Sequence, residues 1–222
     1  MLRAVIFDVD GTLIDSVDLH ALAWHEAFAH FGHNVGIVEA RSQIGKGGDK
    51  LLPVFLSQDQ IGDHGEALEA WRGNHFKARY LSLVRPFSAV PELLQRLRDQ
   101  GTKLAVASSA KKDELEAYLD IARVGDWFDV TVSSGDVESS KPDPDVFQAA
   151  MRKLGVRADE AIAIGDSPYD AEAARRTGVR TIGVLAGGFS EALLREAGCI
   201  DVYAGPAGLL AKFDASPLKI MA

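Results

Sequence analysis

The amino-acid sequence predicts an α/β fold built on a doubly wound parallel sheet, with a helical domain inserted near the start of the chain. Short apolar runs of strand length recur after residue 86, and amphipathic segments of helix length separate them. Between residues 15 and 85 strand-like runs are missing, and apolar residues recur with helical spacing instead. We therefore expect a Rossmann-like α/β core formed by residues 1–14 and 86–222 and an α-helical cap formed by residues 15–85.

The first strand is expected over residues 3–9, where an apolar run without helical spacing is typical of a strand buried on both faces of a parallel sheet. The helical cap begins with apolar residues four positions apart, namely Leu19, Ala23, Ala27 and Phe31. Further helical pieces are expected over residues 51–56 and 68–76. The segment 45–48 contains three glycines and is expected to interrupt a helix.

Helices and strands alternate along the second part of the core. Helices are expected over residues 90–100, 111–121, 143–154, 171–177 and, as the last full helix, 191–197. Strands are expected over residues 103–107, 130–132, 161–164, 181–184 and 201–203. A glycine follows four of these helices, and Gly101 in particular suits a left-handed helix cap. Strands separated by helices in this way imply parallel pairing with right-handed crossovers.

Composition and charge narrow the classes of function. The chain has 222 residues, of which 47% are hydrophobic and 25% charged, as in ordinary soluble globular proteins. Its longest apolar runs are strand-sized and fall far short of the roughly 20 residues that span a bilayer. The net charge of −8 repels nucleic acid and anionic membrane surfaces, although it does not exclude one small phosphorylated ligand. The single cysteine, Cys199, permits no internal disulfide, and the start of the chain lacks a signal-peptide pattern, so we expect a cytoplasmic protein.

Polar side chains collect where the predicted strands end, which is the edge at which ligands bind in such sheets. They come from four segments: the loop after the first strand, the end of the second strand, the stretch before the helix expected over 143–154, and the loop after the strand expected over 161–164. In chain order the residues are Asp8, Asp10, Thr12, Ser108, Lys141, Asp166 and Asp170. Each segment alone has a structural explanation, such as a turn or a helix cap, but their shared position favours a functional site.

The residue types at this edge point to phosphate chemistry. Asp8 and Asp10 are two positions apart as a strand ends, so their side chains tend to face the same way and their charges repel. Asp166 adds a third carboxylate, and a hard cation of the Mg²⁺ type is the natural way to neutralise the group. Lys141 and the hydroxyl of Ser108 can then bind the oxygens of a phosphate group.

These motifs resemble those of the haloacid dehalogenase superfamily. The matching residues are the Asp-x-Asp-x-Thr loop at 8–12, Ser108, Lys141 and the Gly-Asp-x-x-x-Asp motif at 165–170. The resemblance covers essentially the whole chain and is most specific over residues 137–178. The position of the cap after Asp15 resembles the branch that contains phosphoglycolate phosphatase and β-phosphoglucomutase.

The resemblance implies a role for each motif residue. Asp8 would be the nucleophile that forms an aspartyl-phosphate, and Asp10 would protonate the leaving oxygen and then activate water. Mg²⁺ would be held by Asp8, Asp166 and the backbone carbonyl of Asp10, and Asp170 would support either the metal site or Lys141. The phosphate would be contacted by three residues, namely Thr12, Ser108 and Lys141.

The cap is expected to supply substrate specificity, because the core handles only the phosphate group. His20 and Trp24 lie one helical turn apart, and a similar pair occurs in β-phosphoglucomutases and in several sugar-phosphate phosphatases of this branch. His20 either acts at the site or packs locally. Lys46 either belongs to a substrate-binding loop or lies in a plain helix connection.

The function we expect is that of a Mg²⁺-dependent phosphatase that hydrolyses a small phosphorylated metabolite through an aspartyl-phosphate. The alternative is a phosphosugar mutase of the β-phosphoglucomutase type that uses the same nucleophile, and a non-catalytic binding module is a third possibility. Such mutases often have Glu-Asp where this chain has Gly165-Asp166, which favours hydrolysis, and Asp10 argues against the dehalogenases of the superfamily. We expect a monomer or homodimer whose partner is the small substrate and neither nucleic acid nor a membrane.

Overall fold

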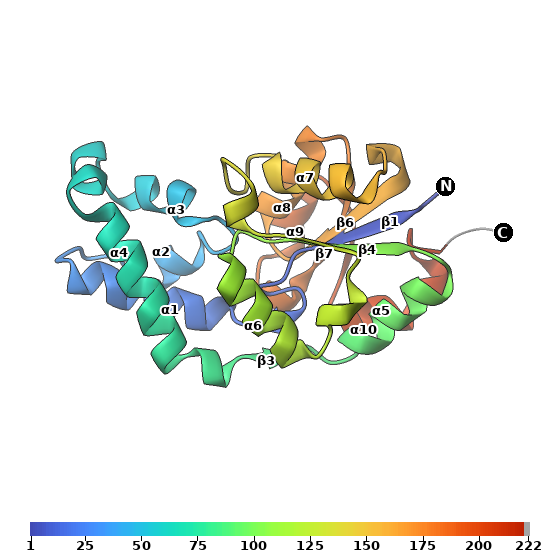
Figure 1. Ribbon diagram of the computed structural model, residues 1–222, viewed down its shortest axis with the longest axis horizontal. Coiled ribbons are helices and arrows are strands. Elements are labelled where there is room, and N and C mark those ends of the chain that lie inside the picture. The colour runs from blue at the N-terminus through green and yellow to red at the C-terminus, as the bar shows by residue number, and fades with distance from the viewer. Residues whose placement is uncertain (220–222) are drawn as a thin grey trace.

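The computed structural model describes residues 1–219 and contains a six-stranded parallel sheet (Figure 1). The strand order is β5-β4-β1-β6-β7-β8, with β1 in the centre. The strands are β1 (Ala4–Phe7), β4 (Lys103–Ala107), β5 (Val130–Val132), β6 (Ala161–Gly165), β7 (Arg180–Val184) and β8 (Cys199–Tyr203). Helices cover both faces of this sheet, which confirms the predicted doubly wound α/β class.

The alternation of side chains in β1 explains the two helical layers. Val5 and Phe7 pack on one side, against α5 (Val90–Asp99), α6 (Lys112–Ala122) and α10 (Pro206–Ala211). Ala4 and Ile6 pack on the other side, against α7 (Asp145–Leu154) and α8 (Pro168–Arg176). Helix α9 (Glu191–Ala197) lies beside α8. Strand β1 is therefore packed against apolar side chains on both faces of the sheet.

Among the core elements that differ from the prediction, three have a local explanation. The first strand ends at Phe7 rather than at residue 9, because the carbonyl of Val9 accepts from the backbone N–H groups of Thr12 and Leu13 in a tight turn. Helix α8 begins at Pro168 rather than at 171, since the Ser167 side chain caps it by accepting from the backbone N–H of Asp170. Helix α10 was not predicted, because six residues are too few to display helical periodicity.

The inserted segment contributes four helices that lie to one side of the sheet (Figure 1). They are α1 (Val17–His30), α2 (Ile37–Arg41), α3 (Gly48–Phe55) and α4 (Gln58–Arg79). They share an apolar cluster that includes Trp24, Phe28, Leu51, Leu52 and Leu68. Helix α4 is longer than the expected piece at 68–76, because Ser57 and Gln60 form a capping box at its start.

A two-stranded antiparallel sheet links the insert to the core. It pairs β2 (Ile14–Asp15) with β3 (Arg85–Pro86), so the two points at which the chain leaves and rejoins the core are adjacent. Strands of two residues leave no signal in the sequence, and the division at residues 15 and 85 stays a prediction. Short 3₁₀ turns occur at 81–83, 125–127, 134–136, 158–160, 185–187 and 213–215. Within residues 1–219, no helix has the combination of length and apolarity required to cross a membrane.

Candidate active site

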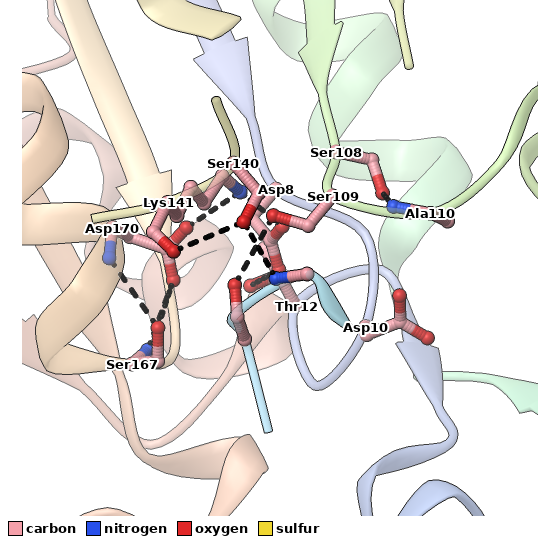
Figure 2. Close-up of polar contacts among 12 residues, drawn as sticks. Asp8, Asp10, Thr12, Ser108, Ser109, Ala110, Ser140, Lys141, Ser167 and Asp170 are labelled. Atoms are coloured by element: carbon pink, nitrogen blue, oxygen red, sulfur yellow. Dashed lines mark hydrogen bonds and ion pairs between the residues drawn. The ribbon is translucent and has the colours of Figure 1, made fainter. Parts of the chain in front are cut away.

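The side chain of Lys141 lies at the centre of a buried charged cluster. Its Nζ is 2.5 Å from Asp8 Oδ1 and 2.7 Å from Asp170 Oδ1, and the side chain has no exposed surface (Figure 2). Asp8 follows β1, Lys141 precedes α7, and Asp170 lies in the first turn of α8. Burial would lower the pKa of Lys141, but the charges of Asp170 and Asp8 raise it, so the ammonium stays protonated. The structure thus brings together three of the predicted site residues.

Asp170 and Asp8 are oriented by further hydrogen bonds. The backbone N–H and the Oγ of Ser167 donate to Asp170 Oδ2 at 3.1 and 2.6 Å, which directs the other carboxylate oxygen of Asp170 toward Lys141. The Oγ1 of Thr12 lies 3.4 Å from Asp8 Oδ2. Of the two roles expected for Asp170, the contact with Lys141 is therefore present in the structure.

Asp166 is enclosed in the same region without a hydrogen-bond partner for one of its oxygens. The residue is 2% exposed, and within the described residues no group hydrogen-bonds to its buried Oδ1. A Cβ atom at Gly11 or at Gly187 would overlap the Asp166 carboxylate, so both glycines leave the room that it occupies. An unpaired buried carboxylate is costly unless a cation or a proton accompanies it.

The carboxylates fit a hard divalent cation. One oxygen each from Asp8, Asp166 and Asp170 lies within 4.8 Å of the others. Burial and the charge of Asp170 raise the pKa of Asp8 to about 7, and burial and the charge of Asp8 raise the pKa of Asp166 well above its usual range. A bound cation would relieve this repulsion. The predicted metal set had Asp10 in place of Asp170, with Asp10 contributing its backbone carbonyl, and that assignment stays a prediction.

The side chain of Asp10 points away from this cluster (Figure 2). Its Oδ1 accepts a hydrogen bond from Ser16 Oγ at 2.5 Å and lies 3.0 Å from His20 Nε2. Burial would raise the pKa of Asp10, but the charge and hydrogen bond of His20 and the hydroxyl of Ser16 lower it. Asp10 in this arrangement is therefore a hydrogen-bond acceptor, turned toward the insert.

His20 is fixed on several sides. Its ring stacks on Phe76 with centroids 4.0 Å apart, its Nε2 lies 3.0 Å from the hydroxyl of Tyr118, and its Nδ1 lies 3.4 Å from Arg72 Nη1. Arg72 in turn lies 3.3 Å from Glu114 of α6, so core and insert meet in one polar cluster. Tyr118, Arg72 and Glu114 were not predicted, because only the docking of α4 against α6 brings them to His20.

Ser108 directly follows β4, and Lys46 lies in the segment between α2 and α3; the roles expected for both residues stay predictions. Ser108 is buried at the end of β4, and its Oγ accepts from the backbone N–H of Ala110 at 3.0 Å. Lys46 donates to Gln43 Oε1 at 2.6 Å and lies over the ring of Tyr169, 4.5 Å from its centroid. Burial lowers the pKa of Lys46.

A cavity of about 240 Å³ lies between the core and the insert and is lined by residues of both. Asp8 and Asp10 line it from the core, and His20, Lys46 and Arg72 are among the residues that line it from the insert. The cavity is large enough for a small ligand and opens onto both predicted catalytic carboxylates.

Ser140, which precedes Lys141, ties the insert to the core. Its Oγ accepts from the backbone N–H of Gly47 at 3.0 Å, and its backbone N–H donates to Asp49 Oδ2 at 3.2 Å (Figure 2 includes Ser140). The Ser140 hydroxyl also donates to Asp49 Oδ1. The only signal for this role in the sequence is the position of Ser140 beside Lys141.

Comparison with known proteins identifies a matching family and several similar proteins. Residues 5–184 match the family of haloacid dehalogenase-like hydrolases. The pyrophosphatase PpaX of Halalkalibacterium halodurans is 30% identical over 181 residues, which cover 81% of this chain and 82% of that protein. The phosphoglycolate phosphatase of Aquifex aeolicus is 29% identical over 180 residues, which cover 81% and 83%. The crystal structure of a hydrolase from Pseudomonas syringae has a TM-score of 0.89 and 32% identity, covering 96% of this chain and 98% of that one.

Proposed function

Since this chain belongs to the haloacid dehalogenase-like hydrolase family, we propose that it hydrolyses the phosphate ester of a small metabolite, with Asp8 as the nucleophile. The observation that carries the proposal is the buried contact of Asp8 with Lys141, at the edge of a cavity that Asp10 also lines. The names of the two curated relatives, a pyrophosphatase and a phosphoglycolate phosphatase, support the transfer of phosphoryl groups.

In the first step a carboxylate oxygen of Asp8 attacks the phosphorus atom, and the bond from phosphorus to the leaving oxygen breaks. Lys141, 2.5 Å from Asp8 Oδ1, favours the ionised carboxylate and can bind a phosphate oxygen. Thr12 and Ser108 are the further phosphate contacts. The product of this step is an aspartyl-phosphate on Asp8.

Asp10 handles the protons of both steps. It gives a proton to the leaving oxygen in the first step and takes one from water in the second, when water attacks phosphorus and the bond to Asp8 breaks. The hydrogen bonds from Ser16 and His20 hold Asp10 as an acceptor, which suits the second step. The imidazole of His20, 3.0 Å from Asp10, can hold the proton that Asp10 needs in the first step.

Mg²⁺ is the cation we propose for the carboxylate cluster, held by Asp8, Asp166 and the backbone carbonyl of Asp10. When bound, it would offset the negative charge of the carboxylates and of the phosphate group. The unpaired Oδ1 of Asp166 and the raised pKa of Asp8 support this assignment.

The direct test is the release of inorganic phosphate from a panel of phosphate monoesters, with and without Mg²⁺. We expect turnover only with the metal, and no turnover by Asp8→Asn. Phosphate release by Asp8→Asn at the wild-type rate would contradict the assignment of the nucleophile.

A phosphosugar mutase remains the second candidate, and the contact of His20 with Asp10 favours it. A mutase must protect its phosphoenzyme from water until a sugar hydroxyl accepts the phosphate. A group of the insert that keeps Asp10 from activating water would provide this protection.

A further inference from the structure

We infer that Glu69 recognises a hydroxyl group of the substrate, so that the preferred substrate is the phosphate ester of a small neutral polyol or sugar and not a compound with a second anionic group. The inference rests on the proposed function, because it concerns the part of the cavity that would receive the leaving group.

Glu69 projects from α4 into the cavity and is partly buried. Two other carboxylates on the cavity wall are engaged, since Asp49 accepts hydrogen bonds from Ser140 and Glu114 pairs with Arg72 at 3.3 Å. Glu138 lies exposed on the wall of the cavity. Within residues 1–219 no hydrogen bond or ion pair reaches the Glu69 side chain, so both of its oxygens can accept from a ligand.

The position of the Glu69 carboxylate depends on Gly48, the first residue of α3. A Cβ atom at Gly48 would overlap Oε1 of Glu69, so the missing side chain provides the room for this carboxylate. Burial raises the pKa of Glu69, while the charges of Lys111 and Arg72 lower it. A ligand that donates a hydrogen bond would satisfy this partly desolvated acceptor.

Arg72 supplies a matching donor. It lies three residues after Glu69 on α4, so the two side chains share one face of the helix. Arg72 Nε is buried and makes no hydrogen bond to any group in the part of the chain that the structure describes. A hydroxyl group can donate to a carboxylate and accept from an N–H at once, whereas a carboxylate or phosphate can only accept.

The charges of the cavity disfavour a second anion in this region. Of the lysine and arginine side chains on its wall, Arg72 is paired with Glu114 and Lys46 donates to the neutral amide of Gln43. The charge of Lys111 acts to lower the pKa of Glu69. A second anionic group placed beside Glu69 would meet the repulsion of its carboxylate. A neutral hydroxyl-bearing group meets no such repulsion.

The volume of the cavity limits the size of the substrate. With a volume of about 240 Å³, the cavity has room for a small phosphate ester. Glycerol 3-phosphate and erythrose 4-phosphate are suitable probes of this class.

The experiment compares kcat/KM for these two esters with kcat/KM for phosphoglycolate and pyrophosphate, and p-nitrophenyl phosphate serves as a reference without a hydroxyl group. We expect the wild-type protein to prefer the polyol and sugar esters at least tenfold. Glu69→Ala should lower kcat/KM for these esters at least tenfold, mainly through KM, and should affect p-nitrophenyl phosphate, which offers no hydroxyl group to Glu69, much less.

Gly48→Ala is the second variant, because its methyl group displaces the flexible end of Glu69 while alanine suits the first turn of a helix. It should reproduce most of the loss seen with Glu69→Ala. Glu66→Gln, an exposed position on α4 outside the cavity, is the matched control and should behave as the wild type.

Two outcomes would overturn the inference: a wild-type preference for phosphoglycolate or pyrophosphate, or an equal loss of activity on all compounds in Glu69→Ala and Gly48→Ala. Failure of the proposed function looks different, because no phosphate would then be released from any compound, p-nitrophenyl phosphate included.

Discussion

The imidazole Nε2 of His20 lies 3.0 Å from Oδ1 of Asp10, although His20 belongs to the first helix of the insert and Asp10 to the loop after the central strand. Asp10 and His20 both line the cavity, so the protonation of Asp10 is coupled to the position of the insert. His20, for which the sequence left open a role at the site or in local packing, thus contacts the residue that we propose as the acid and base.

His20→Ala should reduce kcat by about tenfold or more, because Asp10 loses the group that sets its protonation, whereas a residue that only packs would affect stability alone. Steady-state kinetics and thermal unfolding measure the two effects separately. His25→Ala is the control on the same helix, since the His25 ring lies 2.7 Å from the carbonyl of Val35, away from Asp10. An unchanged kcat and pH profile in His20→Ala would assign His20 to packing.

The two aspartates should differ in which step they support. Asp8→Asn should lose phosphate release by at least about a thousandfold, because the nucleophile is gone. Asp10→Asn should still transfer phosphate slowly to Asp8 from p-nitrophenyl phosphate, whose leaving group needs little proton transfer. Intact-protein mass spectrometry detects the trapped phosphoenzyme, and its appearance in Asp8→Asn would disprove the proposed order of events.

Metal removal should abolish turnover, and Ca²⁺ should restore it poorly because its larger and more flexible coordination misplaces the reacting groups.

The thermal stability of the metal-free protein should depend on pH. The pKa of Asp8 is raised to about 7 in the folded metal-free protein, so unfolding releases protons and the metal-free Tm should fall as the pH rises from about 4 to 7. Mg²⁺ should therefore raise Tm more at pH 8 than at pH 6. A Tm gain that is independent of pH would contradict this assignment.

Asp136 should stabilise the loop that leads to Lys141. Its carboxylate accepts from the backbone N–H and hydroxyl of Ser133 at 2.9 and 2.8 Å and pairs with Lys153, and these contacts lower its pKa to about 2. The stabilisation is present above about pH 4 and is lost as the pH falls through about 2. Since the side chain is about one-third exposed, we expect Asp136→Asn to lose only about 1 kcal/mol at pH 7.

Urea unfolding at several pH values measures this difference, with Asp120→Asn as the control at an exposed position. The gap between Asp136→Asn and the wild type should shrink toward pH 2. A gap that stays constant down to that pH would exclude the carboxylate as its source.

The choice between phosphatase and mutase can be made with β-glucose 1-phosphate and a trace of the 1,6-bisphosphate. We expect release of inorganic phosphate without isomerisation, in keeping with Gly165-Asp166. Enzymatic determination of glucose 6-phosphate alongside free phosphate gives both rates. Faster formation of glucose 6-phosphate than of phosphate would instead identify a mutase.

The sequence was sufficient to predict that Asp8, Lys141 and Asp170 lie at one edge of the sheet, because segments that follow parallel strands collect there. The contact of Asp170 with Lys141 was only one of the two roles that the resemblance implied for Asp170. The surroundings of Asp10 were harder to predict. Tyr118 and Arg72 reach His20 only through the way the insert docks on α6, which no local pattern encodes. The role of Gly48 was hidden as well: a helix-breaking segment was expected there, and only the structure reveals that the glycine makes room for Glu69.

The pairing of Ile14–Asp15 with Arg85–Pro86 keeps both ends of the insert side by side, about 5 Å apart. A segment whose two ends are neighbours can be lengthened, shortened or exchanged without pulling on the strands that carry the reacting carboxylates. Under the proposed function, changes in the insert can alter which leaving group is accepted while Asp8 and Asp10 keep their positions at the end of the central strand.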